Sequence, residues 1–417
     1  MAASMGMCLN ARDAADCTKN EGICVRFIDN LRGKGVFANR DFKSNDTLFT
    51  ENPLVCAQFL WNEFYRYTAC EFCMRSMETA QDMARRLSAN PSLVLPHPEC
   101  CTLQSEKHTA CPQCQVPYCS TECRDQAVAQ YHQVLCVGQS PPDPEHPLVV
   151  LQETWKNMHY PPETASITII NKMIATVKQA QKKEHVLSAF NQFCQKANNE
   201  EQELAHKLLG SQFQEQIDTL QGMLAGALYE DCISQWFTPE GLRSLIALIG
   251  MNGQGVGTSS LSVYVHNCDA LDLPGDERQA LDSFIDQLYV DIERESGTFL
   301  NCEGSALYQL QSCCNHSCQP NAEIQFNDNN STLTAVALRD ITEGEEICIC
   351  YLDECSRERS HHSRQKILRE NYLFHCSCVK CLEQCDDADQ TSSDEEEEEE
   401  DEETQDAVTE DGTVMDT

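Results

Sequence analysis

The stretch of sequence that decides the fold is residues 315–321, which reads Asn315-His316-Ser317-Cys318-Gln319-Pro320-Asn321. Further along, the chain contains Gly344-Glu345-Glu346-Ile347-Cys348-Ile349-Cys350-Tyr351. Short β-rich runs at Thr332 to Leu338 and Glu346 to Tyr351 predict strands in this region. The two motifs, in this order and with these residue types, are the most specific feature of the chain.

The length and composition indicate a soluble globular protein with room for more than one domain. The chain has 417 residues, and 41% of them are hydrophobic. No apolar run reaches the roughly 18 residues of a membrane span. Residues 1–10 lack a basic start followed by a long apolar core, so we expect no secretory signal.

The cysteine content favours zinc in a reducing compartment. There are 27 cysteines, an odd number, and many of them stand in Cys-x-x-Cys-like spacings. Without an export signal, a disulfide framework is the weaker interpretation.

The acidic charge of the chain is concentrated at its C-terminal end. The net charge is −36, and 18 acids but no Lys or Arg follow Lys380. The rest of the chain therefore carries −18. A segment of this composition cannot bury enough apolar surface to fold, so we predict a disordered tail over residues 382–417. It either solubilises the protein or attracts basic partners, and it disfavours direct binding of nucleic acid.

Between the ends, the pattern changes from strands to a cysteine-rich block and then to helices. β-rich runs lie at Val25–Ile28, Gly35–Ala38 and Thr47–Phe49. The prolines at 141–144 predict a linker. Leucines and isoleucines at helical spacing then predict helices from Glu163 to about Gly250, and another from Asp276 to Glu295. These apolar stripes are expected to form core.

Two groups of cysteines have the spacing of metal ligands. The first is Cys111-x2-Cys114-x4-Cys119-x3-Cys123-x8-His132-x3-Cys136, to which Cys70-x2-Cys73 adds a further pair. Eight ligands suffice for two tetrahedral zinc ions, and disulfides would not explain the histidine. The second group is Cys376-x-Cys378-x2-Cys381, whose three thiolates leave one zinc position open.

The paired motifs resemble the signature of SET-domain protein lysine methyltransferases, and the cysteine-rich block resembles a MYND finger. A SET domain split by such a finger is typical of the SET-and-MYND-domain (SMYD) family. The resemblance covers residues 22 to 381. Most members continue into a helical C-terminal domain, whereas this chain ends in the acidic tail and is most similar to an acidic-tailed member.

The resemblance implies a ligand set for each of three structural zinc ions. Alternating pairs in the finger assign Cys70, Cys73, Cys119 and Cys123 to one ion, and Cys111, Cys114, His132 and Cys136 to the other. The 37 residues between Cys73 and Cys111 exceed the usual spacing, so Cys100, Cys101 and His108 remain substitutes for the first pair. In SET proteins the cysteine of the Asn-His-Ser-Cys motif completes the last site, which implies Cys318 with Cys376, Cys378 and Cys381.

The resemblance also implies an S-adenosylmethionine site and a catalytic tyrosine, Tyr351. The residues that match cofactor-binding positions are Arg32, Gly33, Lys34, Gly35, Asn252, Asn315, His316, Tyr351 and Phe374. The segment Asn252-Gly253-Gln254 has a glutamine where the family has an aromatic residue, so the number of methyl groups added stays open. About fifty residues are then inserted before Gly304-Ser305-Ala306-Leu307-Tyr308, and Tyr308 is expected to line the lysine channel.

The expected fold is α+β: a β-rich SET domain with a knot-like crossing, interrupted by a zinc finger and a helical insert. The predicted parts are the N-terminal SET part (22–69), the MYND finger (70–136), a linker and helical insert (137–250), the C-terminal SET part with its insertion (251–355), a post-SET zinc segment (356–381) and the acidic tail (382–417).

The implied activity is methyl transfer from S-adenosylmethionine to lysine in histones or other basic proteins, such as ribosomal proteins. The alternative is a zinc-dependent adaptor whose finger binds proline-rich peptides, with the SET fold as a scaffold. A third possibility, an acidic histone-binding chaperone, rests only on the tail. We further expect a monomer, in cytoplasm and nucleus, with no membrane attachment.

Overall fold

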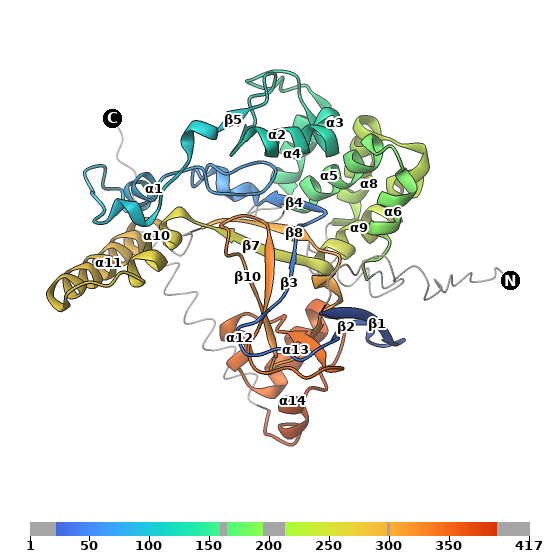
Figure 1. Cartoon of the computed structure of the whole chain (residues 1–417). Coiled ribbons are helices and arrows are strands. Elements are labelled where there is room, and N and C mark those ends of the chain that lie inside the picture. The colour runs from blue at the N-terminus through green and yellow to red at the C-terminus, as the bar shows by residue number, and fades with distance from the viewer. Residues whose placement is uncertain (1–21, 159–164, 195–212, 298–300, 390–417) are drawn as a thin grey trace. The chain divides into compact units, whose positions relative to one another are not determined.

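The computed structural model describes residues 22–158, 165–194, 213–297 and 301–389 (Figure 1). Two compact units divide these residues between them. The first unit contains residues 22–52, 308–325 and 333–389, and the second contains residues 53–307 and 326–332, within the described ranges. Residues 390–417 of the predicted acidic tail lie outside the described residues, as do Leu204, Leu208 and Leu209 of the predicted helical region.

The first sheet of the first unit brings the two sequence motifs onto neighbouring strands. Its order is β1-β2-β12-β9. The strands are β1 (Ile23–Asp29), β2 (Gly33–Ala38), β12 (Glu346–Ile349) and β9 (Asn315–His316). β12 runs antiparallel to β2 and parallel to β9, so that Ile349 lies opposite His316. Val36, Ala38 and Ile347 are buried, as expected for small and β-branched residues on the covered side of a sheet.

A second sheet and three short helices complete the first unit. The sheet is antiparallel in the order β10-β11-β3, with β10 (Ala322–Gln325), β11 (Leu333–Ala337) and β3 (Thr47–Glu51). The helices are α12 (Glu354–Glu358), α13 (His361–Tyr372) and α14 (Val379–Glu383). The side chains of Asp353 and Ser360 accept backbone N–H groups at the starts of α12 and α13, as N-caps do.

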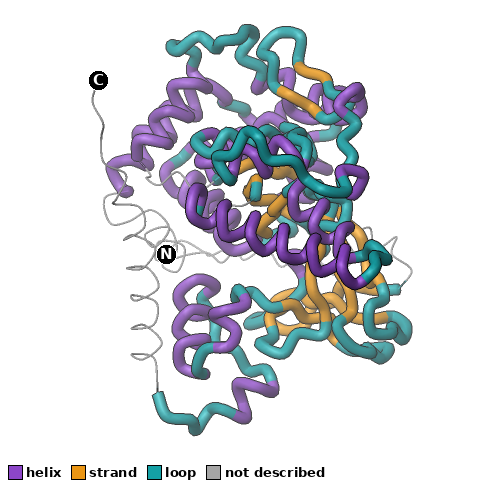
Figure 2. Tube along the Cα trace, turned by 90° about the vertical axis from the view of Figure 1, so that its left-hand side faces the viewer, coloured by secondary structure: helices purple, strands orange, loops and turns teal. Residues whose placement is uncertain are grey.

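The second unit is centred on a helical core. The helices of this core are α4 (Pro147–Met158), α5 (Ser166–Gln179), α6 (Lys183–Phe190), α8 (Phe213–Leu228) and α9 (Pro239–Asn252). α5 to α9 lie in the region from Glu163 to about Gly250 that the sequence predicts to be helical, whereas α4 precedes it. Ile217, Leu220, Leu224 and Leu228 repeat along α8 and are all buried in this core. Figure 2 shows the helices of the structure in purple and its strands in orange. Within the described ranges, none of the helices combines the length and the apolar character that crossing a membrane requires.

The finger and a small sheet lie in the same unit. The sheet has the order β4-β8-β7, with β4 (Val55–Gln58), β8 (Cys302–Leu307) and β7 (Gly253–Thr258). The finger contains the short hairpin β5 (Thr109–Ala110) and β6 (Pro117–Tyr118), followed by α2 (Thr121–Ala127) and α3 (Gln133–Leu135). Tyr118 and Tyr131 are buried between its cysteines.

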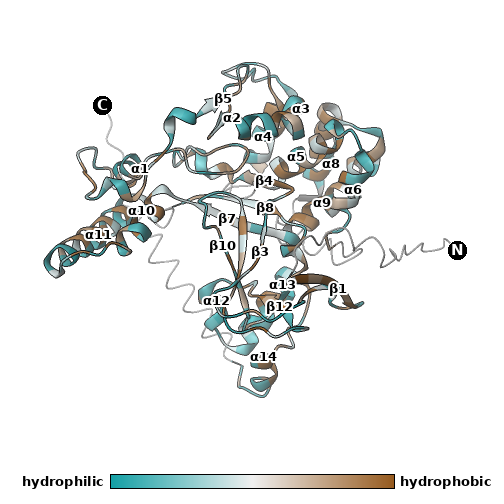
Figure 3. Cartoon of the chain, in the orientation of Figure 1, coloured by the Kyte–Doolittle hydropathy of each residue, from teal (hydrophilic) through white to brown (hydrophobic). Residues whose placement is uncertain are grey.

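The two insertions that separate this sequence from the family pattern pack on each other. We call residues 78–101 and 259–296 the paired insert. It contains α1 (Ala80–Leu87), α10 (Ser260–Asp269) and α11 (Gly275–Ser296) around one apolar core. Figure 3 shows hydrophobic residues along one side of α11; Leu281, Ile285, Leu288 and Ile292 are buried there, which confirms the predicted helix.

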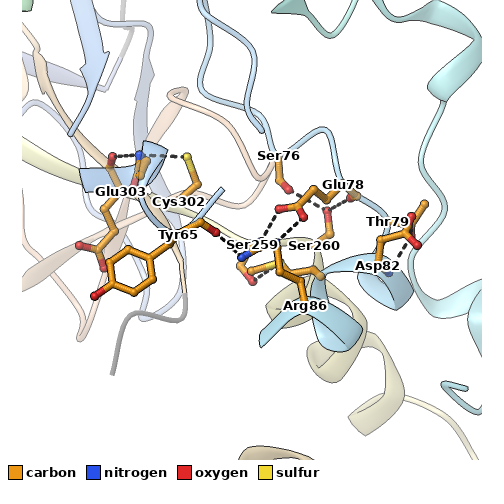
Figure 4. A network of polar contacts seen from close by, with 12 residues as sticks. Tyr65, Ser76, Glu78, Thr79, Asp82, Arg86, Ser259, Ser260, Cys302 and Glu303 are labelled. Carbon is orange, nitrogen blue, oxygen red and sulfur yellow. Dashed lines mark hydrogen bonds and ion pairs between the residues drawn. The ribbon is translucent and has the colours of Figure 1, made fainter. Parts of the chain in front are cut away.

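A polar network joins the two halves of the paired insert and links them to the neighbouring segment at Tyr65 (Figure 4). The guanidinium of Arg86 forms two hydrogen bonds with the Glu78 carboxylate and donates a third to the carbonyl of Tyr65, at 2.6 Å. The hydroxyl of Ser260 donates to the carbonyl of Glu78 at 2.7 Å. Segments that are distant in sequence are therefore fixed to each other by charge-assisted and backbone hydrogen bonds.

A buried lysine joins the finger to the helical core. Lys172 on α5 has 1% of its surface exposed. Its ammonium lies 2.7 Å from a carboxylate oxygen of Glu71 and donates to the carbonyls of Glu71 and Cys56, at 2.9 and 2.8 Å. The same ammonium lies over the ring of Tyr131. All of its hydrogen-bonding capacity is thus used inside the protein.

Candidate active site and metal centres

Asn315 connects the two sequence motifs with the hairpin near the N-terminus. The side chain starts from β9, and its amide nitrogen donates to the carbonyl of Lys34 at 3.0 Å and to the carboxylate of Glu346 at 2.7 Å. Glu346 in turn lies 3.5 Å from the guanidinium of Arg32. The structure therefore brings the predicted residues Arg32, Lys34 and Asn315 together.

The glycines of this hairpin are required by its shape. Gly33 has φ = +69°, a conformation that other residues rarely adopt. A Cβ atom at Gly35 would lie 2.6 Å from the side chain of Ile28 and 2.9 Å from the Glu346 carboxylate. Side chains are therefore excluded at Gly35, where the backbone approaches Glu346 closely.

His316 is held as a neutral ring between Tyr351 and Cys318. Burial lowers the pKa of His316 to about 4. Its Nδ1 accepts the backbone N–H of Tyr351 at 2.9 Å, so the single ring proton is on Nε2, which lies 3.3 Å from the Cys318 sulfur. The histidine thus links the tyrosine backbone to a predicted zinc ligand.

Tyr351 stands in a cluster of aromatic rings with its hydroxyl fixed. The hydroxyl donates to the carbonyl of Cys314 at 2.7 Å. The ring centroids of Tyr372, His316 and Phe374 lie 4.9, 5.3 and 6.3 Å from that of Tyr351. Tyr372 is a site residue that the sequence analysis missed. The spacing Tyr372-x-Phe374-x-Cys376 was the signal that could have identified it.

Asn252 is a buried residue of the second unit. It ends α9, and its side chain donates to the carbonyls of Leu248 and Cys194 and accepts the N–H of Cys194. Tyr308 is fully buried in the first unit. Contact of Asn252 with the cofactor, and of Tyr308 with the substrate lysine, stay predictions.

The finger contains two groups of four metal-ligating side chains, and the structure groups them as the alternating pairs predict. Cys70 and Cys73 lie with Cys119 and Cys123, and Cys111 and Cys114 lie with His132 and Cys136. Within each group the ligand atoms are all within 4.8 Å of one another. The substitutes Cys100 and Cys101 instead pack in the core of the paired insert, and His108 belongs to neither group.

The post-SET segment forms a third group with the Asn-His-Ser-Cys motif. The sulfur atoms of Cys318, Cys376, Cys378 and Cys381 lie within 4.8 Å of one another. Hydrogen bonds from Cys318 and Cys376, with the buried guanidinium of Arg364, lower the pKa of Cys381. Thiolates, and thiolates with one imidazole, are the donor sets that structural Zn²⁺ takes, so the three groups fit three zinc ions.

Replacing Cys378 with serine should reduce the bound zinc from three ions per chain to two. The remaining three thiolates do not fill a tetrahedral site, and the segment that carries Phe374 should then lose order. Mass spectrometry of the native protein or elemental analysis gives the zinc count. The exposed Cys355 lies outside the three groups, so Cys355→Ser should keep all three ions. Three ions retained in Cys378→Ser would disprove the assignment.

Comparison with known proteins is consistent with this geometry. The sequence profile described as "SET domain" matches residues 33–352. "Protein-lysine N-trimethyltransferase SMYD5" of Danio rerio is 59% identical over 385 residues, covering 92% of each chain. The protein of that name from Homo sapiens is 59% identical over 368 residues, covering 88% of each chain. "Histone-lysine N-methyltransferase SMYD3" of Mus musculus is 44% identical over 98 residues, 22% of each chain.

The first two relatives match 92% and 88% of the chain. The residues that carry the two motifs lie within the matched SET domain. This chain therefore belongs to the SMYD family of SET-domain proteins.

Proposed function

We propose that this protein transfers methyl groups from S-adenosylmethionine to lysine side chains of other proteins. The observation that carries the proposal is the fixed hydroxyl of Tyr351, set among aromatic rings beside the Asn315 and His316 pair. An adaptor that used the SET fold only as a scaffold would not require this arrangement. The relatives named above as protein-lysine N-trimethyltransferases support the same activity.

The residues of the first unit suit an in-line transfer to a neutral amine. S-adenosylmethionine supplies an electrophilic methyl group when bound. The Tyr351 hydroxyl donates a hydrogen bond to the carbonyl of Cys314, and this contact fixes the direction in which the Tyr351 oxygen orients a lysine amine. The rings of Tyr351, Tyr372 and Phe374 exclude water and favour an uncharged amine over an ammonium ion. Alignment and exclusion of water, without an acidic base, provide the acceleration.

The nature of the substrate follows from charge and from the relatives. The chain outside its acidic tail carries −18, which favours lysine-rich, basic segments such as those of histones and ribosomal proteins. We include trimethylation in the proposal because the relatives are named for it. Binding of proline-rich peptides by the finger, a monomeric state, and action in cytoplasm and nucleus are further parts of the proposal, and they rest on the family resemblance.

Tritium transfer from labelled S-adenosylmethionine to core histones and to a ribosomal-protein fraction tests the activity. Labelled substrate bands with the enzyme, and none without it, are the expected result. Mass spectrometry of the labelled band then gives the number of methyl groups. Absence of label together with absence of S-adenosylmethionine binding by calorimetry would contradict the proposal and favour the zinc-dependent adaptor.

A further inference from the structure

A carboxylate outside both motifs binds the backbone that leads into the first of them. Glu51, the last residue of β3, accepts the N–H of Leu310 on one carboxylate oxygen at 2.9 Å and the N–H of Gln311 on the other at 3.0 Å. Burial raises the pKa of the Glu51 carboxyl, which these backbone N–H groups oppose. Glu51 is separated from these donors by about 260 residues along the chain, so this contact is made only in the folded protein.

The bound backbone forms a tight turn that ends at the Tyr351 contact. The N–H of Cys313 donates to the carbonyl of Leu310 at 3.0 Å, and the N–H of Cys314 donates to that of Gln311 at 2.8 Å. Cys313 and Cys314 are both buried. The next group along the chain is the carbonyl of Cys314, which accepts the Tyr351 hydroxyl at 2.7 Å. The carboxylate and the hydroxyl are therefore joined by one continuous hydrogen-bonded turn.

We propose that Glu51 is a positioning residue for methyl transfer: its carboxylate fixes the turn 310–314, and the turn fixes the hydroxyl of Tyr351. This inference rests on the proposed function. Glu51 does not touch the reacting atoms, and it acts through the Cys314 carbonyl. The role needs an ionised carboxylate. Both of its oxygens accept hydrogen bonds and neither carries a proton, so it can bind two neighbouring N–H groups at once.

The physical reason for an effect on rate is the steep dependence of catalysis on alignment. A displacement of about 1 Å in a catalytic group costs on the order of a hundredfold in rate. If the turn relaxes, the Cys314 carbonyl moves and the hydroxyl of Tyr351 loses its fixed direction. The cofactor-binding pair follows the turn on β9, where its backbone pairing with β12 holds it independently of the Glu51 carboxylate.

Glu51→Gln tests this role with little change in shape. The amide keeps one acceptor but places an NH₂ donor against the N–H of Leu310 or Gln311, so one hydrogen bond is lost and two donors face each other. We expect the single-turnover rate of methyl transfer to fall about tenfold or more, with the affinity for S-adenosylmethionine unchanged within about twofold. Glu323 is an exposed carboxylate on strand β10 of the same sheet, and Glu323→Gln should leave both quantities unchanged.

The possible outcomes separate the inference from the proposed function. Wild-type rates in Glu51→Gln would overturn the inference. A parallel loss of rate, cofactor affinity and thermal midpoint would also overturn it, because that pattern indicates general support of the fold. If Glu51→Gln does not fold, Glu51→Asp is measured in its place, because it retains two charged acceptors on a shorter side chain. The same comparison of transfer rate, cofactor affinity and thermal midpoint then decides. Failure of the wild type itself to transfer methyl groups would instead contradict the proposed function.

Discussion

Tyr351→Phe is expected to lower the rate of methyl transfer by roughly 10²- to 10³-fold, the usual effect of removing one hydrogen-bonding group that acts at the reacting centre. Phenylalanine retains the ring that packs on His316, Tyr372 and Phe374, and loses only the hydroxyl held by the Cys314 carbonyl. Binding of S-adenosylmethionine should therefore persist. Single-turnover transfer of tritium, with cofactor affinity measured by calorimetry, separates the two effects.

A matched control for this substitution is Tyr229→Phe, which removes the hydroxyl of a tyrosine that is 48% exposed and lies in the second unit. It should transfer methyl groups at the wild-type rate. Full turnover in Tyr351→Phe would refute the assigned role of the hydroxyl, whatever the control shows.

Lys172→Met is expected to destabilise the second unit by about 3–5 kcal/mol, the typical cost of removing one member of a buried ion pair. Methionine fills much of the space, but it leaves the Glu71 carboxylate and the carbonyls of Glu71 and Cys56 without their shared donor. Glu71 stands between Cys70 and Cys73, so the zinc bound by this pair should be released more readily to a chelator.

Tryptophan fluorescence during urea unfolding measures this effect in the second unit alone, because all three tryptophans of the chain, Trp61, Trp155 and Trp236, belong to that unit. The exposed Lys182 provides the control, and Lys182→Ala should leave the midpoint unchanged. The double variant Lys172→Met/Glu71→Gln should recover part of the loss, since no unpaired charge remains. A midpoint unaltered in Lys172→Met would show that the pair contributes nothing to stability.

The part of the site that the sequence predicted is the part encoded in short motifs. Asn315, His316 and Tyr351 could be assigned because residue type and spacing within a few positions identify them. Spacing identified the candidate zinc ligands in the same way, and the family resemblance supplied their division among three ions. The amphipathic pattern predicted α11 to within a residue at each end, because one buried stripe on a long helix has a clear period.

The remaining features depend on contacts that leave no local pattern. Glu51 binds backbone N–H groups about 260 residues away. Because almost any residue type has a backbone N–H, the sequence gives no sign that Glu51 contacts this segment. Lys172 lies among apolar residues on α5. Nothing in the sequence of this helix predicts its partners on β4 and in the finger. The packing of the two insertions on each other likewise depends on tertiary structure rather than on any repeat or motif.

The paired insert has a consequence for synthesis on the ribosome. The apolar side of α1 packs on α10 and α11, the first of which begins about 170 residues later in the chain. At about 5–20 residues per second, translation takes roughly 10–30 s to deliver those partners. During this interval Met83, Ala84 and Leu87 lack the native surfaces of α10 and α11. The nascent chain is therefore expected to depend on chaperones at this stage, and truncation between the two insertions should yield a product prone to aggregation and degradation.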